Sequence, residues 1–291
     1  MAAMDDTHYG CRELKATERP LVAGLVERVP RDAALLLRVA GAHREGFTGW
    51  YFGALEDNRR LAAVMCVGEH GVHVLGERRA ALRAMAEAQV KLQGLNLGGP
   101  TKQHELLGDN ESLGAFWEVF RGVKGRTLVA DHLQPLLRAD QLPDTAPSKR
   151  ARVTVATASE LRLVYELSGE REAHERHLDP RRTHPGAHRA ACEATIAAGR
   201  QLVGWEEDKP ALVAELRPVD DHTTLLDRIW VPVAYRSRKR LVGGALYHAR
   251  RLRGLADKDV LLLAADAAIA EAAELAGFIP HRTYRHVILR G

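Results

Sequence analysis

The stretch RIWVPVAYRSRKRLVGGALYHARRL, residues 228–252, carries the pattern from which the fold of this chain can be inferred. An apolar, β-branched run leads to Pro232, a cluster of cations follows, and the rest has helical spacing. This order predicts a strand that enters a helix through a basic turn. A helix N-terminus after such a turn favours a phosphate, because its free backbone N–H groups and the helix dipole both attract an anion. The turn has no glycine, although glycine lets a backbone approach a phosphate closely.

The composition around this stretch is that of a globular chain. The chain has 291 residues, of which 46% are hydrophobic and 27% charged, enough for two domains of ordinary size or one large domain. Of the 42 Lys and Arg residues, 34 are Arg, which reflects either genome composition or an anionic partner. We expect no membrane span and no signal peptide, because no run approaches the ~20 apolar residues that a span needs.

The cysteines indicate a reducing environment. Cys11, Cys66 and Cys192 are widely spaced and form no CxxC pair or disulfide framework. We therefore expect the protein in the cytoplasm.

Residues 138–150, RADQLPDTAPSKR, have the composition of a linker. We predict a loose tail over residues 1–15, a first domain over 16–138, a linker over 139–150 and a second domain over 151–291. The first domain is predicted as helix, then a meander of strands, then helix. The second has the predicted order β-α-α-β-β-β-α-β-α-β, with a hairpin that turns at Asp208, Lys209 and Pro210. The fold class is therefore α/β, with a mixed sheet in each domain.

Three sets of positions after the linker form a family-like pattern. They are Val231, Pro232, Tyr235 and Arg236 at the strand end, Asp208 in the hairpin turn, and Ala276, Gly277 and Phe278 before the last strand. On these positions and the element order, residues 151–291 resemble the GCN5-related N-acetyltransferase (GNAT) superfamily. The first half resembles, by element order alone, the degenerate GNAT-like domain of tandem proteins. The resemblance implies two tandem acyl-CoA acyltransferase domains.

The resemblance implies an acyl-CoA-dependent N-acyltransferase, which moves an acyl group from acetyl-CoA or another acyl-CoA to an amine. The acceptor amine is not identified by any motif, and the oligomeric state is left open. In the family, a cleft opens where the central strand splays from its parallel neighbour, here near Val233 and Val260–Leu263. The positions that correspond to CoA-binding residues are the backbone of Val231 and Val233, the turn Arg236, Ser237, Arg238, Lys239, Arg240, Leu241 and Val242, and Asp266.

The chain departs from the family at its two most specific motifs. The three glycine positions of the turn are Ser237, Lys239 and Leu241, whereas Gly243 and Gly244 come about one helical turn later. Two further family positions differ: the Tyr that usually serves as general acid is Ala273, and the Asn that opens the last helix is Asp266.

Three interpretations follow from these departures. The turn binds CoA through its remaining N–H groups and cations; or the domain keeps the fold as a catalytically degenerate regulatory or binding protein; or the basic segment binds another polyanion. Because no aromatic residue interleaves the arginines, we do not expect nucleic acid as the partner.

Acyl transfer needs a base that removes a proton from the amine. Asp227 lies on the strand before the turn among apolar neighbours, and its burial would raise its pKa. The alternative is that Asp227 pairs with Arg228 or Arg217, and Glu215 is a second candidate base. His174, His177, His184 and His188 lack ligand spacing, so no metal site is expected.

Overall fold

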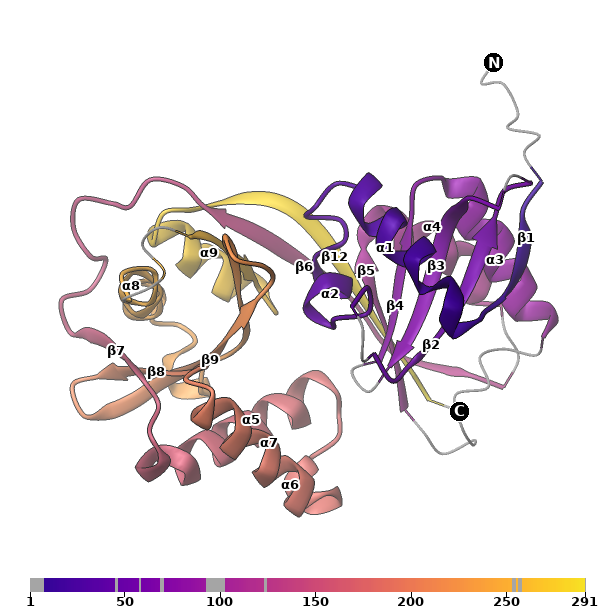
Figure 1. The fold of residues 1–291 in the computed structure, drawn as a ribbon. Helices are drawn as coiled ribbons and strands as arrows, with labels where there is room; N and C mark the ends of the chain where they lie inside the picture. The colour runs from indigo at the N-terminus through magenta and orange to yellow at the C-terminus, as the bar shows by residue number, and fades with distance from the viewer. Residues whose placement is uncertain are drawn as a thin grey trace. The chain divides into compact units, whose positions relative to one another are not determined.

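The computed structural model describes residues 8–44, 47–57, 59–68, 71–92, 103–122, 125–252, 255 and 258–290 (Figure 1). The chain divides into two compact units, which differ from the two halves of the sequence. Unit 1 comprises Met1–Leu133 and Thr283–Gly291, and unit 2 comprises Gln134–Arg282. Two long strands, β6 (Thr127–Ala139) and β12 (Phe278–Arg290), begin in one unit and end in the other.

Unit 1 contains five further strands and four helices among the described residues. The strands are β1 (Gly10–Leu14), β2 (Trp50–Leu55), β3 (Leu61–Gly68), β4 (Gly71–Gly76) and β5 (Gln103–Asp109). The helices are α1 (Arg19–Arg28), α2 (Leu35–Val39), α3 (Arg79–Lys91) and α4 (Asn110–Phe120).

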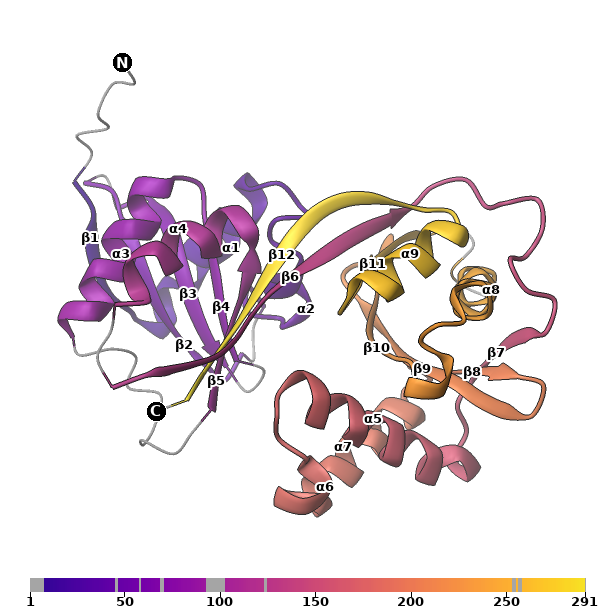
Figure 2. The ribbon, with the colours of Figure 1, turned by 180° about the vertical axis from the view of Figure 1, so that it is seen from behind.

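The strands of unit 1 form a mixed sheet with an apolar core on each face. Strands β1 to β4 pair antiparallel in sequence order, β4 pairs parallel with β5, and β5 pairs antiparallel with the end of β12. One core holds Met85 of α3 and Phe116 of α4, and the other holds Leu25 of α1 and Leu37 of α2. Figure 2 shows α3 and α4 on the face opposite to α1. Because alternate residues of a strand face opposite sides, Val74 and Leu75 of β4 join different cores.

The N-terminal segment corrects one expectation. Residues 1–15 were expected to be loose, but Gly10–Leu14 form β1 and pair with β2 along its whole length. The buried Leu14 anchors this strand in the core that contains α1. The expected tail over residues 1–7 lies outside the described residues.

Unit 2 repeats the arrangement of unit 1. Its further strands are β7 (Ala151–Val155), β8 (Gln201–Glu206), β9 (Lys209–Pro218), β10 (Thr223–Trp230) and β11 (Asp259–Leu263). Its helices are α5 (Leu161–Glu175), α6 (Pro180–Thr183), α7 (Pro185–Ala197), α8 (Lys239–Arg250) and α9 (Ala267–Leu275). Strands β7 to β10 pair antiparallel in sequence order, β10 pairs parallel with β11, and β11 pairs antiparallel with the end of β6.

The element order predicted for residues 151–291 is confirmed, with the short helix α6 added between α5 and α7. Each unit has one parallel strand pair whose two strands are joined by a helix. The pair is β4 and β5 with α3 in unit 1, and β10 and β11 with α8 in unit 2. The mixed α/β fold predicted for both halves is therefore confirmed. Strands β5 and β6 have no counterpart in the prediction, because β5 (QHELLGD) is poor in β-branched residues and much of β6 is exposed.

The Ala276–Gly277–Phe278 motif has a local physical reason. Gly277 follows the end of α9 and has φ at +79°, a backbone conformation that residues with a Cβ rarely adopt. A Cβ at Gly277 would lie 2.2 Å from the carbonyl oxygen of Gln141. Gln141 belongs to the segment 139–150 that was predicted as a linker, and this whole segment lies within unit 2. Phe278 then turns into the core of unit 2.

Candidate functional site

The site in unit 2 begins where β10 separates from β11. The parallel pairing joins Thr223–Leu226 to Asp259–Leu262, and β10 continues beyond it to Trp230. Within this extension the pairing with β9 shifts register, and Arg228 has φ at +51°. A left-handed non-glycine residue costs about 1–2 kcal/mol, so the bulge is held by its surroundings.

The basic turn follows this bulge. A single 3-10 turn over Val233–Tyr235 leads to α8, which begins at Lys239. The side chains of Leu241 and Val242 are buried in the core of unit 2. The predicted turn over residues 236–242 is therefore shorter than expected, because its second half is the first turn of α8.

Three cations of the turn already have internal partners. The guanidinium of Arg236 lies 4.4 Å from the ring centre of Trp230, and its Nε donates to the carbonyl oxygen of Val231 at 3.2 Å. Arg238 donates through both Nη atoms to the carboxylate of Glu206. Lys239 pairs with Glu271 on α9. The phosphate-binding role that the sequence predicts for these cations would compete with these contacts.

The start of α8 nevertheless presents groups that suit an anion. Within the described chain, the backbone N–H groups of Ser237, Lys239 and Arg240 have no hydrogen-bond acceptor. The N–H groups of Leu241 and Val242 both donate to the carbonyl oxygen of Arg238. The side chain of Arg240 is exposed and pairs with no described carboxylate. Three N–H donors and one guanidinium therefore face outward at a helix N-terminus.

Gly243 and Gly244 do not replace the missing glycines of the turn. Both lie inside α8, where a Cβ at Gly243 would be 2.7 Å from the carbonyl oxygen of Ala272. A Cβ at Gly244 would be 2.9 Å from the Cβ atoms of Ser148 and Ala151. The two glycines let α8 approach α9 and the linker closely, so packing explains them.

The remaining predicted CoA positions have mixed surroundings. Val231 is buried, whereas the side chain of Val233 is 77% exposed beside the turn. Asp266 is the N-cap of α9 and accepts a hydrogen bond from the N–H of Ile269 at 2.9 Å. Ala273, where the family has a Tyr, is fully buried in the core.

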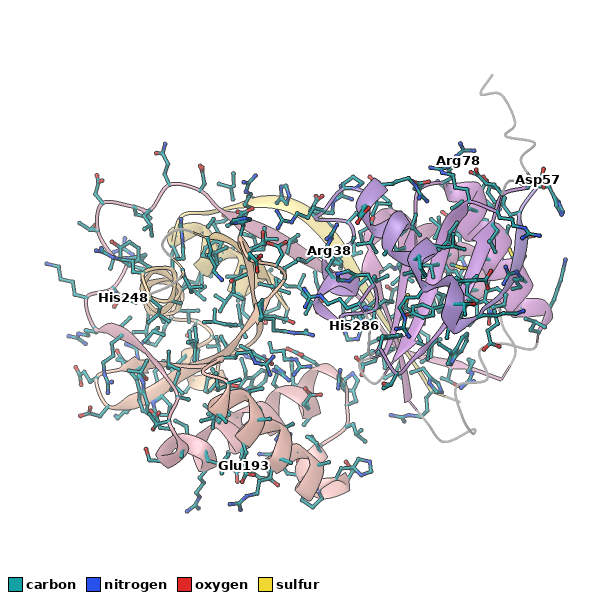
Figure 3. All side chains as sticks on the ribbon, in the orientation of Figure 1. Arg38, Asp57, Arg78, Glu193, His248 and His286 are labelled. Carbon is teal, nitrogen blue, oxygen red and sulfur yellow. The ribbon has the colours of Figure 1, made fainter. Side chains whose placement is uncertain are left out.

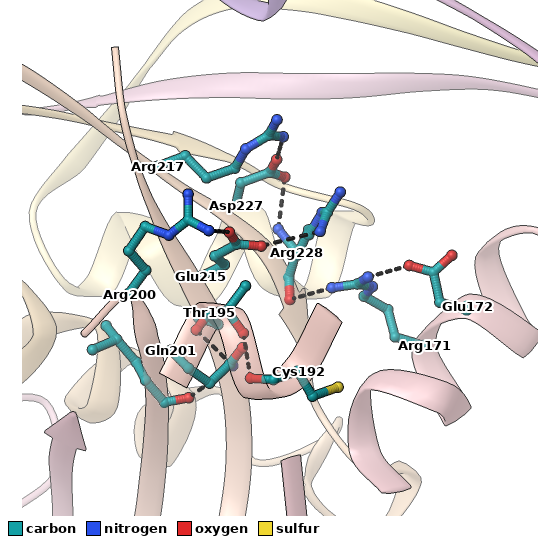
Figure 4. A network of polar contacts seen from close by, with 12 residues as sticks. Arg171, Glu172, Cys192, Thr195, Arg200, Gln201, Glu215, Arg217, Asp227 and Arg228 are labelled. Carbon is teal, nitrogen blue, oxygen red and sulfur yellow. Dashed lines mark hydrogen bonds and ion pairs between the residues drawn. The ribbon is translucent and has the colours of Figure 1, made fainter. Parts of the chain in front are cut away.

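Asp227 and Glu215 are brought together, since they are direct partners across β10 and β9 (Figure 4). Asp227 accepts from Nη1 of Arg217 at 2.9 Å and from the backbone N–H of Arg228 at 2.6 Å. Although burial opposes its ionisation, Arg217 and Arg228 outweigh that effect and lower the pKa of Asp227. The expectation that burial would raise this pKa is wrong, and the alternative of a pair with arginine is confirmed. The guanidinium of Arg217 and the backbone N–H of Arg228 bind the carboxylate of Asp227.

Glu215 is likewise held by cations. One of its oxygens accepts from Nη1 of Arg228 at 3.1 Å, and the other lies 3.8 Å from Nη2 of Arg200. Its side chain is only 7% exposed. Both candidate bases are thus members of one ion-pair network over the bulge.

Helix α5 adds residues to this network that the sequence did not single out. Arg171 is 7% exposed and donates from Nη1 to the carbonyl oxygen of Arg228 at 3.2 Å. Its Nη2 donates to Glu172, and its Nε lies 3.7 Å from a carboxylate oxygen of Glu175. Figure 4 shows Arg171 between α5 and the β10 bulge. The segment GEREAHERH resembles a solvated, charged helix face, so only the tertiary structure identifies these residues.

The two carboxylates that lie beside Arg171 on α5 ionise differently. Burial opposes ionisation of Glu172, but Arg171 and Arg176 outweigh it and lower the pKa of Glu172 to about 2. Burial raises the pKa of Glu175 to about 7, and the negative charges of Glu172 and Asp227 reinforce this against the attraction of Arg171. Glu175 is thus the carboxyl of the network whose pKa lies near neutrality.

The histidines between residues 174 and 188 contact different parts of unit 2. The ring of His174 lies 5.3 Å from that of Trp230, and Nε2 of His188 lies 3.1 Å from the carbonyl oxygen of Tyr165. Among the residues that the structure describes, no three His, Cys, Asp or Glu side chains are grouped to hold a metal. No helix in the described ranges is long and apolar enough to cross a membrane.

The fold defined by these elements is the GNAT fold, present in tandem. Solved structures similar to this chain include a GNAT-family acetyltransferase from Colwellia psychrerythraea, with 12% identity, a TM-score of 0.55, and coverage of 97% of this chain and 99% of that one. A GCN5-related N-acetyltransferase from Sphaerobacter thermophilus has 15% identity and a TM-score of 0.55, with coverage of 97% and 95%.

A tandem GNAT protein from the clavulanic acid biosynthesis pathway has 13% identity and a TM-score of 0.54, over 97% of this chain and 98% of that one. No protein-family model and no curated protein sequence matches this chain. The likeness is therefore one of fold, and it confirms the tandem GNAT arrangement predicted from the sequence.

Proposed function

We propose that unit 2 is an acyl-CoA-dependent N-acyltransferase that moves the acyl group of acetyl-CoA, or of another acyl-CoA, to an amine. The observation that supports it best is the position of the β10 bulge. The bulge lies between a helix start with free N–H donors and a buried network of carboxylates and guanidiniums. A helix start of this kind can bind the pyrophosphate of CoA, and ionisable groups beside it can take the proton of an amine during acyl transfer.

In this proposal the pyrophosphate of CoA binds at the start of α8. The N–H groups of Ser237, Lys239 and Arg240 donate to it, and Leu241 and Val242 fix the helix start by their burial. The side chain of Arg240 is available without rearrangement. The backbone near Val231 and Val233 would contact the pantetheine arm, which requires Arg236 to release the carbonyl oxygen of Val231. Asp266, at the start of α9, lies at the position where the family has an Asn.

The ion pairs of the turn do not exclude this binding. Arg238 is 43% exposed, and Lys239 and Glu271 are 49% and 51% exposed. Exposed ion pairs contribute only about 0–1 kcal/mol, whereas a hydrogen bond to a charged phosphate contributes about 1.5–3 kcal/mol. A pyrophosphate can therefore replace Glu271 as the partner of Lys239. Glu206 is only 11% exposed and binds both Nη atoms of Arg238, so the ligand has to displace it before Arg238 can contribute.

The acceptor amine would bind beside the network that contains Asp227 and Glu215. The guanidiniums of Arg217 and Arg228 hold these carboxylates in place and keep the bulge in its strained conformation. The three cysteines are all free thiols, which suits the cytoplasmic location that we propose.

One set of observations favours a second candidate, a catalytically degenerate GNAT-fold binding or regulatory protein. The turn has no glycine, and Arg236, Arg238 and Lys239 already have partners within the chain. Ala273 is buried where the family has its acid, although solvent can protonate a departing thiolate.

Isothermal calorimetry with acetyl-CoA separates the two candidates. The acyltransferase proposal expects binding that weakens as salt rises and that falls ~10²-fold or more when Arg238→Ala and Lys239→Ala are combined. Arg162→Ala is the matched control, because this arginine is exposed on α5 and is not part of the turn. A flat trace for the native protein would reject CoA binding and favour the degenerate candidate.

A further inference from the structure

The last turn of α5 places a poorly satisfied pair of charged groups against the β10 bulge. Arg171 is 7% exposed and Glu175 is 25% exposed, and their closest atoms are 3.7 Å apart. That separation is longer than a hydrogen bond. Within the described chain, Nε of Arg171 is buried and has no hydrogen-bond partner.

A buried donor without a partner is rare in folded proteins, because its desolvation costs about 1–3 kcal/mol. The other two nitrogens of Arg171 are satisfied by Glu172 and by the carbonyl oxygen of Arg228. Nε, the nitrogen nearest to Glu175, is thus the nitrogen of Arg171 that has no hydrogen-bond partner within the described chain.

Glu175 also differs from the other carboxylates of the network in its hydrogen bonds. Asp227 accepts from Arg217 and Arg228, Glu215 accepts from Arg228, and Glu172 accepts from Arg171. No described group donates a hydrogen bond to Glu175. A carboxylate that already accepts from guanidiniums has little capacity for another proton, whereas the oxygens of Glu175 remain available.

We propose that Glu175 is the residue that takes the proton of the acceptor amine, and that Asp227 is a positioning residue that holds the bulge. This assignment rests on the proposed N-acyltransferase function and deepens it. The charged groups that face Glu175 are Arg171, Glu172 and Arg176 of its own helix and Asp227 of β10. Their arrangement keeps its pKa at about 7, which suits a base that works at neutral pH.

The acyl transfer needs only Glu175, the acceptor amine, the thioester and water. The carboxylate of Glu175 takes one proton from the ammonium form of the acceptor, which leaves a neutral amine. The amine nitrogen forms a C–N bond with the carbonyl carbon of the thioester, and the C–S bond breaks with its electron pair remaining on sulfur. The second nitrogen proton passes through water to the thiolate. No oxidant, reductant or metal is needed.

The decisive variant is Glu175→Gln, which keeps the shape of the side chain and removes its charge. Glu193→Gln is the matched control, because Glu193 lies on the outside of α7 in the same unit and is 51% exposed (Figure 3). Acyl transfer is measured with acetyl-CoA and four amines: free lysine, spermidine, glucosamine and a lysine-containing peptide. We expect turnover by Glu175→Gln to fall ~10²-fold or more, with acetyl-CoA affinity within ~3-fold of native.

The pH profile separates a base from a structural residue. The native rate should rise with pH through about 7, and this rise should disappear in Glu175→Gln. A second readout needs no turnover. Because the pKa of Glu175 is raised in the folded state, the neutral form stabilises the fold, and this contribution is lost as pH rises from about 4.5 through about 7. The melting temperature of the native protein should therefore fall over this range relative to Glu175→Gln.

The outcomes are distinguishable. If native protein binds acetyl-CoA and Glu175→Gln retains its turnover and pH profile, the role of Glu175 is wrong and the acyltransferase proposal stands. If native protein does not bind acetyl-CoA, both fail. If it binds acetyl-CoA but uses none of the four amines, the melting curves decide. If the melting temperatures of native protein and Glu175→Gln then change with pH in the same way, Glu175 is not the base.

Discussion

Glu206 at the end of β8 and Arg238 before α8 form a two-point ion pair, in which both Nη atoms of Arg238 donate to the carboxylate. Arg238 also lies 5.5 Å from the ring centre of Tyr235, so it is fixed from two sides. The cation that the sequence assigns to a phosphate is thus held by a carboxylate of the protein. A diphosphate ligand must displace Glu206 in order to use Arg238.

This relationship predicts that Glu206→Gln increases the affinity for acetyl-CoA. The neutral side chain releases Arg238, so we expect a gain of ~3–10-fold at low ionic strength that shrinks as salt rises. Calorimetry measures the effect, with Glu274→Gln as the control because Glu274 is an exposed carboxylate on α9. Weaker binding by Glu206→Gln would show that Glu206 orients Arg238 for the ligand instead of competing with it.

The Asp227–Arg217 pair should contribute to stability. Their side chains are 13% and 15% exposed, and Asp227→Asn would leave Arg217 without its carboxylate. We expect a loss of about 3 kcal/mol in the free energy of unfolding at neutral pH, measured with urea.

The pH dependence of this loss has a defined sign. Because the folded pKa of Asp227 is lowered, its contribution is present above the ordinary aspartate pKa and disappears as pH falls through the folded pKa. The difference between native protein and Asp227→Asn should therefore narrow in acid. An equal difference at all pH values would contradict the ion-pair explanation.

Gly243→Ala should destabilise unit 2, because the added Cβ would lie 2.7 Å from a backbone oxygen of α9 that cannot easily move. We expect about 2 kcal/mol or more, as for other overpacked sites. Gly186→Ala in α7 is the control, since a Cβ there has no neighbour within 4 Å. That control should be neutral or slightly stabilising. Comparable melting temperatures for the two variants would show that α8 can shift away from α9.

Arg250 should be among the most important polar residues for the stability of unit 2. It is 8% exposed and donates to the carbonyl oxygens of Ala276, Gly277 and Asp140 at 2.8, 2.9 and 2.6 Å. Arg250→Met keeps much of the apolar stem but leaves the carbonyls of Ala276 and Asp140 without a donor in the described chain, whereas that of Gly277 still accepts from the N–H of Asp140. We therefore expect a loss of about 2–4 kcal/mol in urea unfolding.

Arg251→Ala provides the comparison for Arg250, because Arg251 is exposed and its guanidinium donates to the hydroxyl of Tyr247 at 3.0 Å and to no described carbonyl. That variant should lose no more than about 1 kcal/mol. If Arg250→Met lost equally little, the carbonyls would have to be satisfied by water, and the linker would not depend on this contact.

The element order of unit 2 could be predicted from the sequence because local patterns specify it. The strand before Pro232 and the helix of residues 239–250 follow from hydrophobic spacing, and Gly277 is required by the left-handed backbone after α9. Strands β5 and β6 escaped prediction because their pairing with β12 and β11 is non-local. Strand formation at such positions depends on the partner strand more than on propensity.

The sequence also identified the candidate carboxylates Asp227 and Glu215, but it did not predict their ionisation. It placed Asp227 and Glu215 before the basic turn, and the register of β9 with β10 does make them neighbours. It gave the pairing of Asp227 with Arg217 or Arg228 only as an alternative, and in the structure these arginines lower the pKa of Asp227 instead of leaving it raised by burial. Ionisation depends on distances of a few ångströms between residues far apart in the chain.

By itself, therefore, the sequence determined the class of fold, the order of the elements and the place of the basic turn, since periodicity and turn residues act over short distances. The tertiary structure alone decided that Gly243 serves helix packing and that Arg238 is held by Glu206. It also decided that Glu175, on a helix some fifty residues before the bulge, reaches the same network as Asp227. Close approach and burial arise only when α5, β9, β10 and α8 pack together, and these two quantities set the electrostatics of the site.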